Sequence, residues 1–161
     1  MSRARRHARH VALAVLIGSV GALAVGGLYA WNHPLARSDD LRPWVVALCA
    51  AVSVLGGGPV AMATLRLADP GDPAATGARP GPADPDVLHG GAWVGVLERT
   101  AVTASLLTGS LEGIALALAV KGLARYPELR SPAAAERFII GTFTSVLWAC
   151  GCAAVGVALR G

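Results

Sequence analysis

Residues 90–126 read GGAWVGVLERTAVTASLLTGSLEGIALALAVKGLARY, and how this stretch folds decides the architecture of the chain. It is apolar enough for a membrane but is interrupted by charges. Its charged residues are Glu98, Arg99, Glu112, Lys121 and Arg125. A charge at the centre of a helix in lipid costs roughly 2.5–3.5 kcal/mol, so these side chains are expected to have partners. Hydropathy alone finds one helix at about 100–120, in which the aliphatic residues only about offset the cost of a central acid.

The charges are placed symmetrically about Gly109 and Ser110. Glu98 lies 11 residues before Gly109, and Lys121 lies 11 residues after Ser110. If the chain folds back there, the two charges lie level across an antiparallel helical hairpin. Each arm, about 16 residues and 24 Å long, is short for the roughly 30 Å of hydrocarbon in a bilayer. We therefore predict a short hairpin, with a single long helix as the alternative.

Other residues of this stretch fit the same hairpin. Trp93 and Tyr126 are also equidistant from the turn and would lie together at one membrane interface, where aromatic residues are enriched. Ser110 is a good N-cap for the second arm, and Glu112 falls in its first turn, where the helix dipole favours an acid. The turn residues thus predict where the second arm begins.

Composition indicates a membrane protein. Of the 161 residues, 54% are hydrophobic and only 15% are charged, and the mean hydropathy is +0.55. A soluble domain usually has about 25% charged residues. Lys121 is the only lysine among 14 basic residues, a bias typical of GC-rich bacterial genomes. We expect an all-α, polytopic protein of the bacterial cytoplasmic membrane, whose surroundings are the lipid bilayer.

Charge and hydropathy divide the chain into four parts. They are a basic cytoplasmic tail at 1–10, two transmembrane helices within 11–67, a Pro/Gly/Asp-rich cytoplasmic linker at 68–91, and a C-terminal membrane module at 92–161. The uncharged run 11–31 is long for the core of a signal peptide and is interpreted as a retained anchor. The basic tail suits anionic lipid better than nucleic acid. Pro59 is expected to kink the second helix.

The distribution of basic residues favours five membrane segments over four. With five segments and a cytoplasmic N-terminus, eleven basic residues lie inside, namely Arg3, Arg5, Arg6, Arg9, Arg66, Arg79, Arg99, Lys121, Arg125, Arg130 and Arg137. The three outside are Arg37, Arg42 and Arg160. Four segments give eight inside and six outside. The positive-inside rule prefers five, including the hairpin.

The last helix begins after a clear signal. Ser131 and Pro132 are typical of an N-cap followed by a first helical residue, and residues 138–159 form the final span. Glu136 and Arg137 stand at its cytoplasmic entry. Small or hydroxyl residues predict helix-packing positions, since they allow close approach in lipid. The candidates are Gly18, Ala22 and Gly26 on the first helix, and Gly141, Thr142 and Ser145 on the last.

Sequence motifs for catalysis or metal binding are not found. Cys49, Cys150 and Cys152 all fall within predicted spans, without a CxxC or a Cys/His set, and His89 has no ligand at a suitable spacing. There is no nucleophile elbow, phosphate loop or nucleotide fingerprint. We therefore expect no metal, no cofactor and no enzymatic activity.

Residues 90 to about 150 resemble the C-terminal membrane module of an uncharacterised bacterial integral-membrane family, classed as a domain of unknown function. The shared pattern consists of Trp93, Gly95, Leu97, Glu98, Arg99, Gly109, Glu112, Lys121, Arg125, Glu136, Gly141, Thr142 and Ser145. The N-terminal half departs from the longer members of that family. The resemblance implies a membrane location and supports the polar residues as a set, but it implies no activity.

Two classes of function stay open. In the first, the chain is a non-catalytic interaction, assembly or partner-subunit protein, or a homo-oligomer, and the polar cluster fixes the helices. In the second, it is a small transporter or channel component. The intramembrane cluster would then line an ion path; its candidates are Glu98, Arg99, Glu112, Lys121, Arg125, Glu136 and Arg137. The first is favoured, because paired charges can set helix register without any transport.

Overall fold

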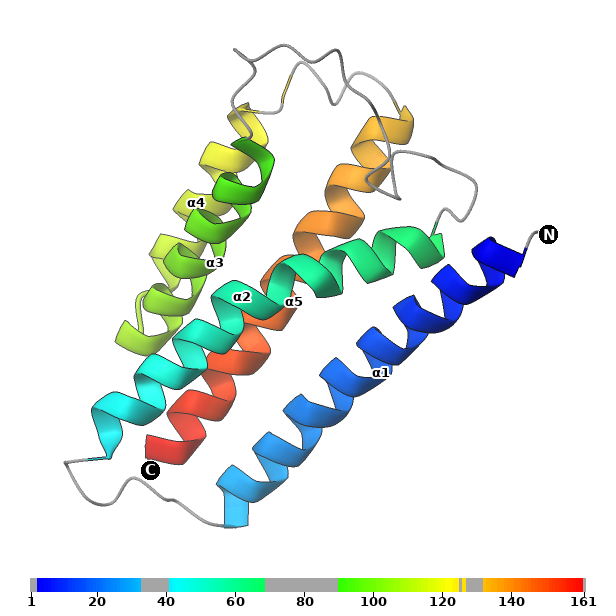
Figure 1. The fold of residues 1–161 in the computed structure, drawn as a ribbon. Helices are drawn as coiled ribbons and strands as arrows, with labels where there is room; N and C mark the ends of the chain where they lie inside the picture. Colours follow the sequence, from blue (N-terminus) through cyan, green and yellow to red (C-terminus); the bar gives the residue numbers. More distant parts are fainter. Residues whose placement is uncertain (1–2, 33–40, 69–89, 125, 127–131, 161) are drawn as a thin grey trace.

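The computed structural model describes residues 3–32, 41–68, 90–124, 126 and 132–160, and their regular structure is entirely helical (Figure 1). The five helices are α1 (Arg3–Asn32), α2 (Arg42–Ala68), α3 (Gly90–Thr108), α4 (Leu111–Ala124) and α5 (Pro132–Arg160). Of the linker predicted at 68–91, residues 69–89 lie outside the described residues, as do Arg125 and Ser131, whereas Ala68 ends α2 and Gly90 and Gly91 begin α3. The expected all-α fold is confirmed, and α5 begins at Pro132, the first helical position expected for that proline.

Three of the helices are long and apolar enough to cross a membrane. Within the described part of the chain these spans are His7–Ala30, Pro43–Ala68 and Ala134–Leu159. Large hydrophobic side chains cover their outer surfaces, such as Ile17 on α1 and Phe143 on α5, which are 70% and 64% exposed. Such a surface suits lipid far better than water. The fold is that of a helical membrane protein.

The helices α2 and α5 form the centre of the bundle. They share the most extensive contact, while α1 packs on one side of this pair and the α3–α4 hairpin on the other (Figure 1). Buried residues of α5 recur at spacings of three and four, the period of a helix face. This face consists of Thr142, Ser145, Ala149, Cys152 and Gly156. Its small residues let α2 and α5 approach closely, as in other membrane helix pairs.

The chain reverses at Gly109, as the symmetry of the sequence predicts. Gly109 has a φ of 76°, a left-handed conformation that glycine adopts without a steric penalty. The amides of Gly109 and Ser110 donate to the carbonyls of Leu106 and Ser105 at 3.2 and 2.8 Å. These two bonds form the Schellman motif that ends many helices. The single long helix is excluded, and α3 and α4 pack against one another as arms of a hairpin.

Pro59 lies within α2 without ending it. The helix continues from Arg42 to Ala68, and Figure 1 shows it changing direction along its length. Because proline has no amide hydrogen and clashes with the preceding turn, a kink is expected. The second half of α2 thereby diverges from α3, and this divergence positions the pocket described below.

Candidate functional site

Glu98 and Arg99 occupy the middle of α3 and are both buried, at 6% and 7% exposure. Consecutive residues of a helix point about 100° apart, because 3.6 residues make one turn. Glu98 therefore faces α4, whereas Arg99 faces α2 and α5. The pair brings opposite charges to two different helix interfaces.

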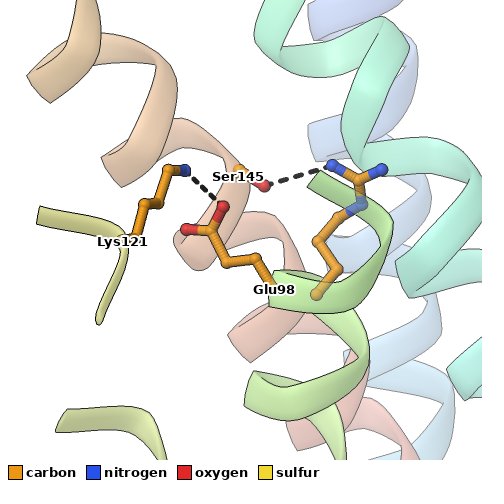
Figure 2. Close-up of polar contacts among 4 residues, drawn as sticks. Glu98, Lys121 and Ser145 are labelled. Carbon is orange, nitrogen blue, oxygen red and sulfur yellow. Dashed lines mark hydrogen bonds and ion pairs between the residues drawn. The ribbon is translucent and has the colours of Figure 1, made fainter. Parts of the chain in front are cut away.

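The carboxylate of Glu98 forms an ion pair with Lys121 on α4. The Lys121 ammonium donates to Oε2 of Glu98, and the side chains reach toward one another from the two arms (Figure 2). The ammonium also lies 5.6 Å from the centroid of the Phe138 ring, within cation–π range. The predicted level placement of the two charges is confirmed. Oε1 of Glu98 is buried and accepts no hydrogen bond from the described residues.

Arg99 joins three helices through neutral groups. Its Nε donates to the Val54 carbonyl of α2 at 2.9 Å, and its Nη1 donates to the Ser145 hydroxyl of α5 at 3.4 Å (Figure 2). Gly57 makes room for this reach, since a Cβ there would overlap the aliphatic part of the Arg99 side chain. The guanidinium thus contacts dipoles rather than a carboxylate.

Two further polar contacts hold α2 to its neighbours. The hydroxyls of Ser53 on α2 and Thr103 on α3 are 2.6 Å apart, and both residues are almost completely buried. The indole Nε1 of Trp148 on α5 donates to the Val52 carbonyl of α2 at 3.3 Å. Hydrogen bonds of this kind between membrane helices contribute about 1 kcal/mol. They hold α2 against α3 and α5.

A pocket of about 500 Å³ lies beside these residues, between α2, α3 and α5. Its polar lining comes from Glu98, Arg99, Lys121 and Ser145. Its remaining walls are glycines and apolar side chains, namely Val54, Leu55, Gly58, Ala61, Met62, Gly95, Val96 and Gly141. The pocket therefore combines a charged end with apolar walls.

The structure brings together only part of the predicted polar cluster. Glu112 is exposed at the tip of the hairpin, where Ser110 donates to its Oε2 at 3.3 Å. Glu136 is exposed on the first turns of α5, and Arg137 is half-buried there and has an interaction partner. Arg125 lies outside the described residues. The site is formed by Glu98 and Arg99 of α3, Lys121 of α4 and Ser145 of α5. The helix α2 contributes the Val54 carbonyl.

The predicted packing positions divide similarly. On α5, Thr142 and Ser145 are buried in the bundle and Gly141 lines the pocket. On α1, a Cβ at Gly26 would lie 3.5 Å from Val155, whereas Gly18 and Ala22 are exposed. The face of α1 that packs against its own chain instead contains Ala12, Leu16, Leu23, Gly26 and Ala30. These residues are four, seven, three and four positions apart, which is the period of one helix face. The prediction from Gly18, Ala22 and Gly26 used a strict spacing of four and therefore missed most of this face.

Ser53, Thr103 and Trp148 were not among the residues singled out from sequence. All three are uncharged and lie in apolar runs, so hydropathy gives no indication that they form hydrogen bonds. The neighbouring Gly56–Gly57–Gly58 run directly precedes Pro59, where the sequence predicts a kink. Consecutive glycines in an apolar helix also indicate that large side chains of other helices approach the backbone closely. Here Trp148 lies against Gly56 and Arg99 lies against Gly57.

Ligand groups for a metal ion do not gather in the described part of the chain, where no three His, Cys, Asp or Glu residues come together. Cys49, Cys150 and Cys152 are free thiols on α2 and α5. They contribute to helix packing; Cys152 lies in the core cluster with Val60 and Trp148. The described residues therefore offer buried charges and a pocket, and no metal-ligand set.

The fold and the site define a helical membrane protein with a buried, partly paired charge cluster. A comparison with protein-family models finds no match. Comparisons with curated proteins and with solved structures find none either. Its function is therefore inferred from the site and the surface alone.

Proposed function

We propose that this chain is a non-catalytic protein of the bacterial cytoplasmic membrane, with its N-terminus in the cytoplasm, that acts by interaction. It would serve as an assembly or partner subunit, or as a homo-oligomer. The resemblance of residues 90–150 to the C-terminal module of an uncharacterised integral-membrane family is part of this proposal only for the membrane location that it implies.

The observation that carries the proposal is the pairing of Glu98 with Lys121. The two charges form an ion pair that joins α3 to α4 within the same chain. Arg99 likewise bonds Val54 and Ser145 on two other helices. Breaking a buried pair costs several kcal/mol, so such a pair fixes helix register strongly. The ion pair holds the two arms of the hairpin together, Arg99 holds the hairpin against α2 and α5, and the two together shape an outer surface.

The helix α4 offers a partner an apolar surface that the rest of the described chain covers little. The described residues of α4 include no buried one, and its large apolar side chains Leu111, Leu116, Val120 and Leu123 are 58–75% exposed. In a membrane, helices associate by close packing and by interhelical hydrogen bonds rather than by excluding water. A helix that its own chain covers so little is a suitable surface for a second membrane protein.

Site-specific photo-crosslinking in the native membrane tests this interaction. A photoreactive residue at Leu116 on α4 is expected to give a protein adduct of discrete mass, either a dimer of this chain or one other protein. The matched position is Leu48 on α2, which is equally exposed at 66% and lies on a central helix. Lipid adducts alone at both positions would contradict the proposal.

The transporter alternative has one observation in its favour. Oε1 of Glu98 is buried and has no hydrogen-bond partner among the residues that the structure describes, and Glu98 lines the pocket. An intramembrane carboxylate of this kind can carry a proton or bind a cation. We expect reconstituted protein to show no flux above empty liposomes with proton- and potassium-sensitive dyes. A wild-type flux that disappears in Glu98→Gln would make transport the leading function.

A further inference from the structure

The guanidinium of Arg99 is a buried charge that forms no ion pair with an acidic residue in the described part of the chain. Its described hydrogen bonds go to the neutral oxygens of Val54 and Ser145, and the nearby Glu98 carboxylate is paired with Lys121. The charged residues lining the pocket, Glu98, Arg99 and Lys121, together carry one net positive charge. An uncompensated charge away from water is unfavourable, so an anion in the pocket would be stabilised there.

Glu98, which also lines this pocket, has a carboxylate oxygen without a hydrogen-bond donor among the described residues. Oε1 of Glu98 is buried, and the Glu98 side chain is only 4% exposed. A buried carboxylate oxygen without a hydrogen bond is unfavourable by roughly 1–3 kcal/mol or more. A ligand that satisfies both groups therefore needs an anionic part for Arg99 and a hydroxyl group for Glu98.

The walls of the pocket show what else the ligand should contain. Val54, Ala61, Met62 and Val96 are apolar, and Leu55 at the rim is 74% exposed on the apolar outer surface of α2. A hydrocarbon chain can extend out of the pocket along this surface. A small hydrophilic phosphate would make no apolar contact with the walls. Basic pockets between membrane helices bind phospholipid headgroups in this way.

We propose that the pocket between α2, α3 and α5 binds an anionic phospholipid with a hydroxyl-bearing headgroup. The phosphate lies against Arg99, a headgroup hydroxyl donates to Oε1 of Glu98, and the acyl chains follow the apolar wall past Leu55. The single negative charge of such a lipid balances the net positive charge of the pocket. Phosphatidylglycerol has this chemistry and serves as the probe.

Binding to the full-length protein in detergent tests the assignment through thermal unfolding and native mass spectrometry. Phosphatidylglycerol is expected to raise Tm saturably. Phosphatidylmethanol has the same charge but no headgroup hydroxyl, and should bind about tenfold more weakly, the effect of losing one hydrogen bond to a charged group. Phosphatidylcholine, which has no net charge and no donor, should bind more weakly still. Equal binding of all three lipids would overturn the proposal.

A water-soluble ester separates a lipid site from a simple phosphate site. Glycerol 3-phosphate presents the phosphate and the hydroxyls without acyl chains, and is expected to give no shift in Tm at the concentrations at which the lipid saturates. If it binds as tightly as phosphatidylglycerol, the lipid assignment is overturned. This result would leave the crosslinking at α4 unaffected, so the lipid site and the proposed function fail independently.

A substitution at Gly58 tests the location without removing any charged group. A Cβ there would meet only Nη2 of Arg99, at 4.0 Å, so the backbone has room for a side chain at residue 58, and we expect the side chain of Gly58→Leu to occupy the pocket. It is expected to retain folding and to reduce phosphatidylglycerol binding at least tenfold. The matched control is Gly18→Leu, on the exposed part of α1 with no atom within 4 Å. Unchanged binding in a folded Gly58→Leu protein would overturn the assignment.

Discussion

The indole ring of Trp148 on α5 lies so close to Gly56 on α2 that a Cβ at residue 56 would be 2.6 Å from its Cζ2 atom. This contact, together with the bond from the indole to the Val52 carbonyl, sets the distance between the two central helices. Two helices in lipid gain little from the hydrophobic effect and depend on such packing. At Gly56, even substitution by alanine should therefore lower the stability of the protein.

We predict that Gly56→Ala lowers the unfolding free energy in detergent by about 1–3 kcal/mol, the usual cost of overpacking a core. The matched control is Gly27→Ala on α1, where a Cβ meets no atom within 4 Å. That change should be neutral or stabilising by up to about 1 kcal/mol, because alanine is the better helix former. Thermal unfolding of the two variants gives the comparison, and equal losses would contradict the packing role of Gly56.

The ion pair between α3 and α4 predicts a coupled response. Glu98→Gln or Lys121→Met alone leaves one uncompensated buried charge, and should lower stability by about 3–5 kcal/mol. The double variant should recover much of this loss, because both charges are then absent. A double-mutant cycle in detergent measures the coupling. Additive losses would show that the two side chains do not interact.

Glu112 is expected to contribute little. It lies exposed in the first turn of α4, where the helix dipole stabilises an acid by less than about 1 kcal/mol. Glu112→Gln should therefore leave unfolding nearly unchanged, in contrast to Glu98→Gln. A loss as large as that of Glu98→Gln would indicate that the hairpin tip packs against another chain.

The orientation of the hairpin in the membrane can also be predicted. The basic residues of the module favour a turn that points away from the cytoplasm. In a variant without Cys49, Cys150 and Cys152, a cysteine at Ser110 should react with an impermeant maleimide added outside intact cells. A cysteine at Tyr126, which is exposed at the other end of the hairpin, should react only after permeabilisation. Outside labelling of position 126 alone would reverse the orientation.

Much of the hairpin could be read from local sequence. A glycine in the turn, a serine before the second arm and equal spacing of Glu98 and Lys121 depend only on helix geometry and capping, which act over a few residues. The Schellman bonds at Gly109 and the pairing of the two charges confirm that prediction. The distribution of basic residues favours five segments because basic residues near the ends of membrane helices tend to stay on the cytoplasmic side. This rule also depends only on local sequence. The part of the chain that the structure describes contains five helices, three of which are apolar and long enough to span a membrane.

The contents of the candidate site could be predicted only in part. Glu98, Arg99 and Lys121 could be predicted because charges in lipid are costly, and all three line the pocket. Glu112 carried the same signal, yet it lies at the tip, because hydropathy does not distinguish an interior position from the end of a short arm. Ser53 and Thr103, without charge, gave no signal at all.

By itself, the sequence determined the membrane class, the helices and the turn at Gly109, because these follow from composition and short-range bonding. Only the tertiary structure decided that Arg99 reaches Val54 across Gly57 and that Trp148 lies on Gly56. It also decided that a pocket with an unpartnered carboxylate oxygen lies between α2, α3 and α5. These features join residues some 45 to 96 positions apart, whose meeting depends on how helices approach and cross. In lipid that approach is set by side-chain fit, which no hydropathy or charge pattern records.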